Sequence, residues 1–180
     1  MVQISGYKFL QFKRGFTFVE ITIVIALILV LAIPIGTLLM NYLKANYFES
    51  TYLKEQYYAN VIMQDIEQRI RRADNGSVNF SNYTLTFSYT DANPDGSKKT
   101  TIYCVYTLQD AGTTNSIFNR GIGTSPNPAV SVFPVGLEKG LIRDFNITIS
   151  TAPPYFAKIA IQTSSGFTLT NSIYLLNYER

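Results

Sequence analysis

The chain of 180 residues is long enough for one globular domain with an appended segment, and its 47% apolar content is enough for a buried core. It contains no histidine, which excludes His-based zinc sites and Ser-His-Asp or Cys-His catalysis; we expect no enzyme and no cofactor. The net charge of +3 comes from three basic residues before position 16, so the rest is neutral and predicts no specific nucleic-acid binding.

The first 15 residues are basic and precede a long apolar run. They contain Lys8, Lys13 and Arg14 and no acid, whereas Ile21–Met40 contains no charge. As a helix, these apolar residues would span about 30 Å, the thickness of the hydrocarbon layer of a bilayer. Because basic residues favour the cytoplasmic side, we predict a single-pass anchor in the cytoplasmic (inner) membrane, with the N-terminus inside and the rest outside.

One acid, Glu20, lies at the start of this apolar run. A carboxylate in lipid costs about 3 kcal/mol unless it has a partner. Cleavage between Gly15 and Phe16 would create one, because the new amino group of Phe16 would be one helical turn from Glu20. An ordinary secretory signal is instead cut after its apolar run, at small residues, and Asn41–Lys44 offers no such site.

The segment KRGFTFVEITIVIALILVL resembles the N-terminus of type IV prepilins and of the pseudopilins of type II secretion. The resemblance covers about the first forty residues and implies cleavage of Gly15–Phe16 by a prepilin peptidase, N-methylation of Phe16 and a role for Glu20 in assembly. It also implies contacts with other subunits, membrane lipid and an inner-membrane assembly platform. The alternative is a single-pass anchor that contains KRG and one glutamate by coincidence.

The helix is predicted to bend or loosen near Val30–Pro34, because Pro34 lacks an amide hydrogen and clashes with the carbonyl four residues earlier, and Gly36 follows it. This is either a kink without a role or, as in the family, a region that loses regularity inside filaments.

An amphipathic helix is predicted beyond the membrane, since Asn41–Asp74 contains neither proline nor glycine. Tyr58, Ile62, Ile66 and Ile70 recur every four residues and define its apolar face, with Val61 and Ala73 beside them. We therefore expect one helix from about Phe16 to Ala73, with Tyr42 and Tyr47 near the outer membrane boundary. The polar side is assigned Glu55, Gln56, Asp65, Glu67, Arg69, Arg71 and Arg72, and its arginines indicate a solvated helix end more than a DNA-binding patch.

After Gly76 the apolar period changes to two, which predicts antiparallel strands and an α+β, pilin-like fold. The expected organisation is a leader (1–15), a membrane or filament-core half-helix (16–40), an amphipathic half-helix (41–75) and a β-rich body (76–180). Strands are expected at Tyr83–Thr90, Thr100–Thr107, Ser116–Asn119, Val130–Val135, Leu141–Ser150, Ala157–Thr163 and Phe167–Leu176.

The segment DANPDGSKK between the first two strands is a hairpin signal. Asp91, Asn93 and Asp95 also resemble the opening of a calcium loop, but Ile102 stands where the closing acid is expected, which favours a turn. The single cysteine, Cys104, alternates with apolar neighbours and is predicted to be a buried strand residue.

The order of the body segments SIFNR, GLIRDFNITI, KIAIQT and YLLN resembles the larger minor pilins and the J-type minor pseudopilins. This resemblance implies a minor structural subunit of a pilus-like or type II secretion filament, at or near the tip and helping to start assembly. The alternative is a filament-borne binding module that contacts a surface, DNA or a secreted substrate.

Overall fold

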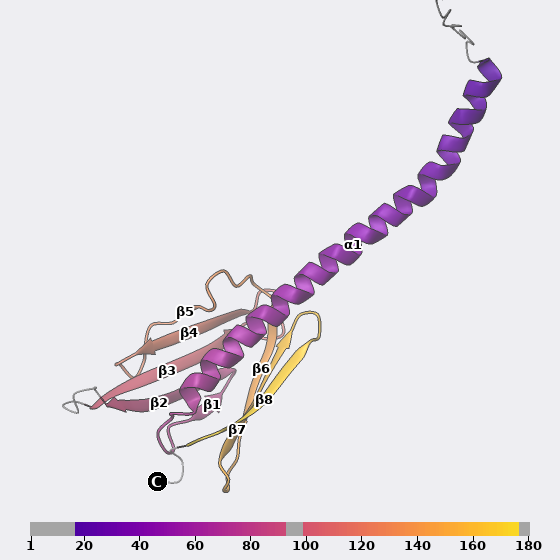
Figure 1. The fold of residues 1–180 in the computed structure, drawn as a ribbon. Coiled ribbons are helices and arrows are strands. Elements are labelled where there is room, and N and C mark those ends of the chain that lie inside the picture. Colours follow the sequence, from indigo (N-terminus) through magenta and orange to yellow (C-terminus); the bar gives the residue numbers. More distant parts are fainter. Residues whose placement is uncertain (1–16, 93–98, 177–180) are drawn as a thin grey trace, which may run out of the picture. The chain divides into compact units, whose positions relative to one another are not determined.

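The computed structural model describes residues 17–92 and 99–176. The predicted cleavage site at Gly15–Phe16 and the turn residues Asn93 and Asp95 lie outside these ranges. The chain divides into two compact units, Met1–Phe48 and Glu49–Arg180. In the described residues, one long helix and eight antiparallel strands confirm the α+β layout (Figure 1).

Helix α1 runs from Phe18 to Ile70 and passes through the boundary between the two units. Its last turn tightens, because the amides of Arg72 and Ala73 donate to the carbonyls three residues earlier, of Arg69 and Ile70. This explains why the helix ends three residues before the expected Ala73.

The segment after α1 is tied to the sheet. Asp74 accepts hydrogen bonds from the amide and the hydroxyl of Thr90, at 3.3 and 2.9 Å, and its own amide donates to the Ser88 carbonyl. Gly76 then takes a φ of +71°, a conformation that favours glycine at this turn.

The first sheet has the order β1-β2-β3-β4-β5. Its strands are β1 (Asn79–Ser81), β2 (Thr84–Ala92), β3 (Lys99–Gln109), β4 (Ile117–Gly123) and β5 (Ser131–Val132). The predicted hairpin is confirmed, since Ala92 pairs with Lys99 and the register continues to Thr84 and Thr107.

The second sheet has the order β6-β7-β8, and all of its pairs are antiparallel. Its strands are β6 (Ile142–Ile149), β7 (Phe156–Thr163) and β8 (Thr168–Tyr174). The sequence pattern predicted the three strands but not that they form a separate sheet.

The core of the body lies between the C-terminal half of α1 and the inner faces of the two sheets. Ile62, Ile66 and Ile70 from the predicted apolar face are fully buried. Phe118 of the first sheet meets Phe145 of the second edge to face, with ring centroids 5.1 Å apart. Cys104 of β3 is buried and unpaired, as predicted.

Two helix positions differ from their predicted environment. Glu55, assigned to the polar side, is only 1% exposed, because it continues the buried face formed by Ala59 and Ile62. Tyr58, assigned to the apolar face, lies at its margin, where its hydroxyl donates to the Gly136 carbonyl at 3.0 Å.

Strand β4 is longer than the predicted Ser116–Asn119, and β1 was not predicted. The sequence does not predict that β4 extends to Gly123, because Gly121 and Gly123 are residues that normally weaken a strand. β1 has only three residues and joins β2 through Asn82 and Tyr83, which both take positive φ angles. Neither feature carries a period-two apolar pattern.

Candidate functional site

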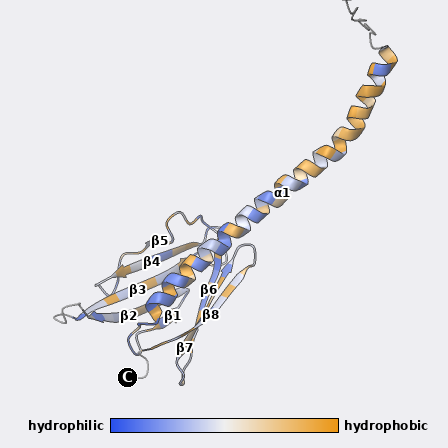
Figure 2. Cartoon of the chain, viewed as in Figure 1, coloured by the Kyte–Doolittle hydropathy of each residue, from blue (hydrophilic) through white to orange (hydrophobic). Residues whose placement is uncertain are grey.

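The most unusual surface of the chain is the N-terminal part of α1. Every large apolar side chain from Phe18 to Met40 is exposed, from 46% at Ile21 to 85% at Phe18. Figure 2 shows hydrophobic colour along this segment, which gives way to mixed colour farther along α1. A helix that is apolar all round requires lipid or other helices around it.

Glu20 closes the first turn of this helix. Its Oε2 atom accepts hydrogen bonds from the amide of Thr17 at 2.8 Å and from the Thr17 hydroxyl at 3.0 Å, while the Thr17 hydroxyl accepts from the Glu20 amide at 3.3 Å. This reciprocal arrangement is a capping box, which satisfies amide groups that have no partner within the helix.

Thr17 is a site residue that the sequence interpretation overlooked. The signal was present, because a threonine three residues before a glutamate, next to an apolar run, is the spacing of a capping box. Glu20 therefore has a local partner in the described part of the chain. Its predicted partner, the amino group of Phe16, lies outside that part.

Pro34 and Gly36 lie within α1, which continues through both positions. The Thr37 hydroxyl donates to the Pro34 carbonyl at 2.8 Å. Every residue from Phe18 to Met40 is helical, so α1 continues through the position where a bend or loosening is predicted.

The second acid of interest, Glu55, is held by the turn between β7 and β8. It accepts hydrogen bonds from the hydroxyls of Ser164 and Ser165 and from the amide of Ser165, the last at 3.1 Å. Burial acts to raise the pKa of Glu55, but the hydrogen bonds from Ser164, Ser165 and Thr163 outweigh it and lower the pKa below 4.5. The carboxylate thus stays charged and anchors this turn to the helix.

A third acid, Asp65, organises the predicted arginine cluster. It contacts Arg69 at 3.3 Å and Arg120 at 3.0 Å, and it accepts a hydrogen bond from the Tyr106 hydroxyl at 2.6 Å. Arg71 pairs with Glu67 in the same helix. Arg69 and Arg71 thus face acids of the chain itself, and Arg69 is partly buried and not fully solvated as predicted.

The calcium interpretation gains no support from the described residues. Asp91 is exposed at the end of β2, and within 17–92 and 99–176 no three His, Cys, Asp or Glu side chains are grouped to hold a metal ion.

Comparisons of the chain with protein-family models, with curated proteins and with solved structures find no match. In the described residues α1 is the one helix long and apolar enough to cross a membrane, and its most apolar window is entirely unburied. Signal sequences near an N-terminus share this property, so the helix by itself supports a membrane span only weakly.

Proposed function

We propose that the chain is a minor pilin or pseudopilin, a structural subunit that is cleaved between Gly15 and Phe16 and enters a filament through α1. Before assembly, the apolar part of α1 anchors the subunit in the inner membrane, with the β-rich body on the outer side. The partners are a prepilin peptidase, the assembly platform, membrane lipid and other subunits. The order of its body segments resembles that of minor pilins and minor pseudopilins, which supports a minor subunit near the filament tip.

The observation that carries this proposal is the contrast within α1. Residues Ala59 to Ile70 bury one face against the body, whereas the large apolar side chains from Phe18 to Met40 have no cover. A lone carboxylate, Glu20, marks the start of the uncovered part. A filament core supplies both a cover for the apolar surface and a cationic partner for the acid.

The capping contact of Glu20 is compatible with this role. Both hydrogen bonds from Thr17 go to Oε2, and in the described residues Oε1 has no hydrogen-bond partner. Oε1 is therefore available to the amino group of a Phe16, from the same or a neighbouring subunit. Pairing with this cation would offset part of the desolvation free energy of the carboxylate when the filament buries it.

The test compares three variants in cells that assemble the filament. Glu20→Ala removes cap and charge, Glu20→Gln keeps a side-chain acceptor without charge, and Thr17→Ala removes the hydroxyl while leaving the charge. If pairing with the amine matters, both Glu20 variants lose incorporation into filaments and Thr17→Ala retains it. Equal loss in Thr17→Ala and Glu20→Ala, with Glu20→Gln normal, would reduce Glu20 to a helix cap.

Processing is tested separately by mass spectrometry of assembled filaments. The proposal requires that residues 1–15 are absent and that Phe16 carries one added methyl group. Filaments that contain the chain with Met1 still attached contradict it.

A second candidate function is a binding module carried by the filament. It is favoured by one observation, an uncharged pocket on the outer face of the first sheet.

A further inference from the structure

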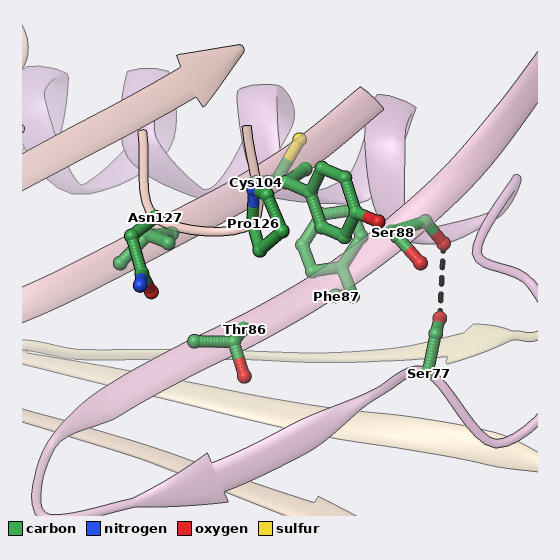
Figure 3. A pocket seen from close by; sticks show the side chains of 9 residues that line it. Ser77, Thr86, Phe87, Ser88, Cys104, Pro126 and Asn127 are labelled. Atoms are coloured by element: carbon green, nitrogen blue, oxygen red, sulfur yellow. Dashed lines mark hydrogen bonds between the residues drawn. The ribbon is translucent and has the colours of Figure 1, made fainter. Parts of the chain in front are cut away.

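A pocket of about 280 Å³ opens on the outer face of the five-stranded sheet (Figure 3). None of the nine lining residues is charged, and the apolar groups of Phe87, Cys104, Val105 and Pro126 contribute to the lining as well as polar ones. The polar side chains are Ser77, Thr86, Ser88, Tyr103 and Asn127.

The alternation of β2 and β3 builds the floor of this pocket. Phe87 and Cys104 also line the pocket, although both residues are almost fully buried on the core side of their strands. Thr86 and Ser88 lie on the opposite face of β2 and are paired in register with Val105 and Tyr103 of β3. The result is two adjacent cross-strand pairs that present hydroxyls, one phenol ring and one valine to solvent.

The two glycines of β4 build the wall. Gly121 and Gly123 are opposite Val105 and Tyr103, and their lack of side chains leaves the outer face of β4 flat. A Cβ on Gly121 would lie 2.9 Å from the carbonyl oxygens of Pro128 and Ala129, and one on Gly123 would lie 3.3 Å from Pro128 Cβ. The segment after β4 therefore folds back onto the sheet, which brings Pro126 and Asn127 to the pocket.

The polar groups of the pocket are available to a ligand. The Ser77 hydroxyl donates to the Ser88 carbonyl at 2.9 Å. Within residues 17–92 and 99–176, no hydrogen bond occupies the side chains of Thr86, Tyr103 or Asn127. Together they offer two hydroxyls and an amide, which both donate and accept, beside an aromatic ring.

We propose that this pocket binds one or two units of a neutral saccharide. A sugar ring combines an apolar C–H face, which suits the Tyr103 ring, with hydroxyls that suit the Asn127 amide and the Thr86 hydroxyl. The absence of charge in the lining disfavours ions, and a volume at the small end of ligand pockets suits a short sugar. The site lies on the body and does not depend on the filament role of Glu20.

The experiment uses the full chain in a zwitterionic detergent without a sugar headgroup. Maltose, cellobiose and N,N′-diacetylchitobiose are the neutral probes, with sialyllactose as the anionic probe and the peptide Ser-Gly-Ser-Gly as the neutral non-sugar probe. Saturation-transfer NMR detects contact and titration gives the affinity. At least one neutral disaccharide should bind saturably.

Site variants then locate the contact. Tyr103→Ala and Asn127→Ala should each weaken binding by about ten-fold, the loss expected for one polar or stacking contact of about 1.4 kcal/mol. Thr86→Trp, which fills the pocket, should abolish binding. Tyr174→Ala on β8 and Asn146→Ala on β6 are matched controls, since both residues are exposed on the other sheet, and they should bind normally.

The proposal is overturned if no neutral disaccharide binds, if sialyllactose or the peptide binds in preference, or if the Tyr103 and Asn127 variants bind like the controls. A thermal melt of each variant checks that it is as fully folded as the unmodified chain, so that a loss of binding is not caused by unfolding. Filament incorporation of the Tyr103 variant stays normal in either case, which separates this test from that of the proposed function.

Discussion

The two halves of α1 share one backbone geometry but differ in burial, because the second half packs one face against the body and the first half leaves its apolar side chains exposed. Ile66 and its neighbours at three- and four-residue spacing are buried by the sheets, whereas Ile28, also within α1, is 59% exposed. Helix formation is local, but burial depends on what surrounds the helix. The first half therefore has an apolar surface that the described residues leave uncovered, and the second half belongs to the fold of the body.

The largest difference is expected from truncating a matched pair of isoleucines. Ile66→Ala should destabilise the body by about 3 kcal/mol, because it leaves a cavity in the core. Ile28→Ala should leave the unfolding of the body unchanged. Urea unfolding of both variants in detergent, followed by near-UV circular dichroism, measures this difference, and equal destabilisation would contradict the division of α1.

A positive charge introduced into each half of α1 should have the reverse pattern of effects: it should be harmful in the first half and harmless in the second. Leu29→Arg should lower insertion into membranes by about 3 kcal/mol, since Leu29 lies in the middle of the apolar run. Gln64→Arg, at an exposed position of the second half, should change neither insertion nor unfolding. A quantitative membrane-insertion assay compares the two variants, and an equal free energy of insertion for both would contradict the role of the apolar run as the anchor.

The two acids of α1 extend the comparison, because Glu20 has a partner three residues away and Glu55 has partners more than one hundred residues away. Glu55→Ala should therefore destabilise the body by about 2 kcal/mol through loss of hydrogen bonds to a charged group. Its neighbour Gln56→Ala is the control and should have little effect.

The pH dependence gives the Glu55 contact a distinct signature. Since the pKa of Glu55 is lower in the folded state, its stabilisation is complete above the unfolded pKa of about 4.5 and is lost as the pH falls through the folded pKa. Glu55→Gln should flatten the acid limb of stability below about pH 5. An unchanged limb would assign the acid sensitivity to other carboxylates.

The smallest effect is expected at an exposed contact of the second half. Lys54 and Glu138 lie 3.4 Å apart, and both side chains are more than half exposed. Lys54→Ala should change stability by less than about 0.5 kcal/mol, and this difference should vanish in high salt. A larger loss would mean that the loop around Glu138 is fixed to α1 through this pair.

Periodic patterns predicted the parts of the fold that repeat a simple environment. The helix, the β2–β3 hairpin, the strands from Ile142 onward and the burial of Cys104 all follow from period-two or period-four apolar residues. These signals are strong because each element buries one continuous face.

The missed features depend on contacts between distant residues. From sequence alone, Glu55 cannot be distinguished from a solvated glutamate, because its partners Ser164 and Ser165 are brought to it only by the fold. The length of β4 and the uncharged pocket depend on how the segment near Pro128 folds over Gly121. At the candidate site, the apolar run and Glu20 were evident from sequence, whereas the partner of Glu20 at Thr17 was overlooked although its signal was local.

The lone cysteine also provides an intrinsic chemical probe of local unfolding in the body. Burial raises the pKa of the Cys104 thiol to about 11, so at pH 8 it is both protonated and shielded from reagents. A maleimide can then alkylate Cys104 only in molecules in which β3 has opened. The labelling rate therefore measures the free energy of that opening without any engineered probe. Each variant above can be ranked this way, even in intact membranes.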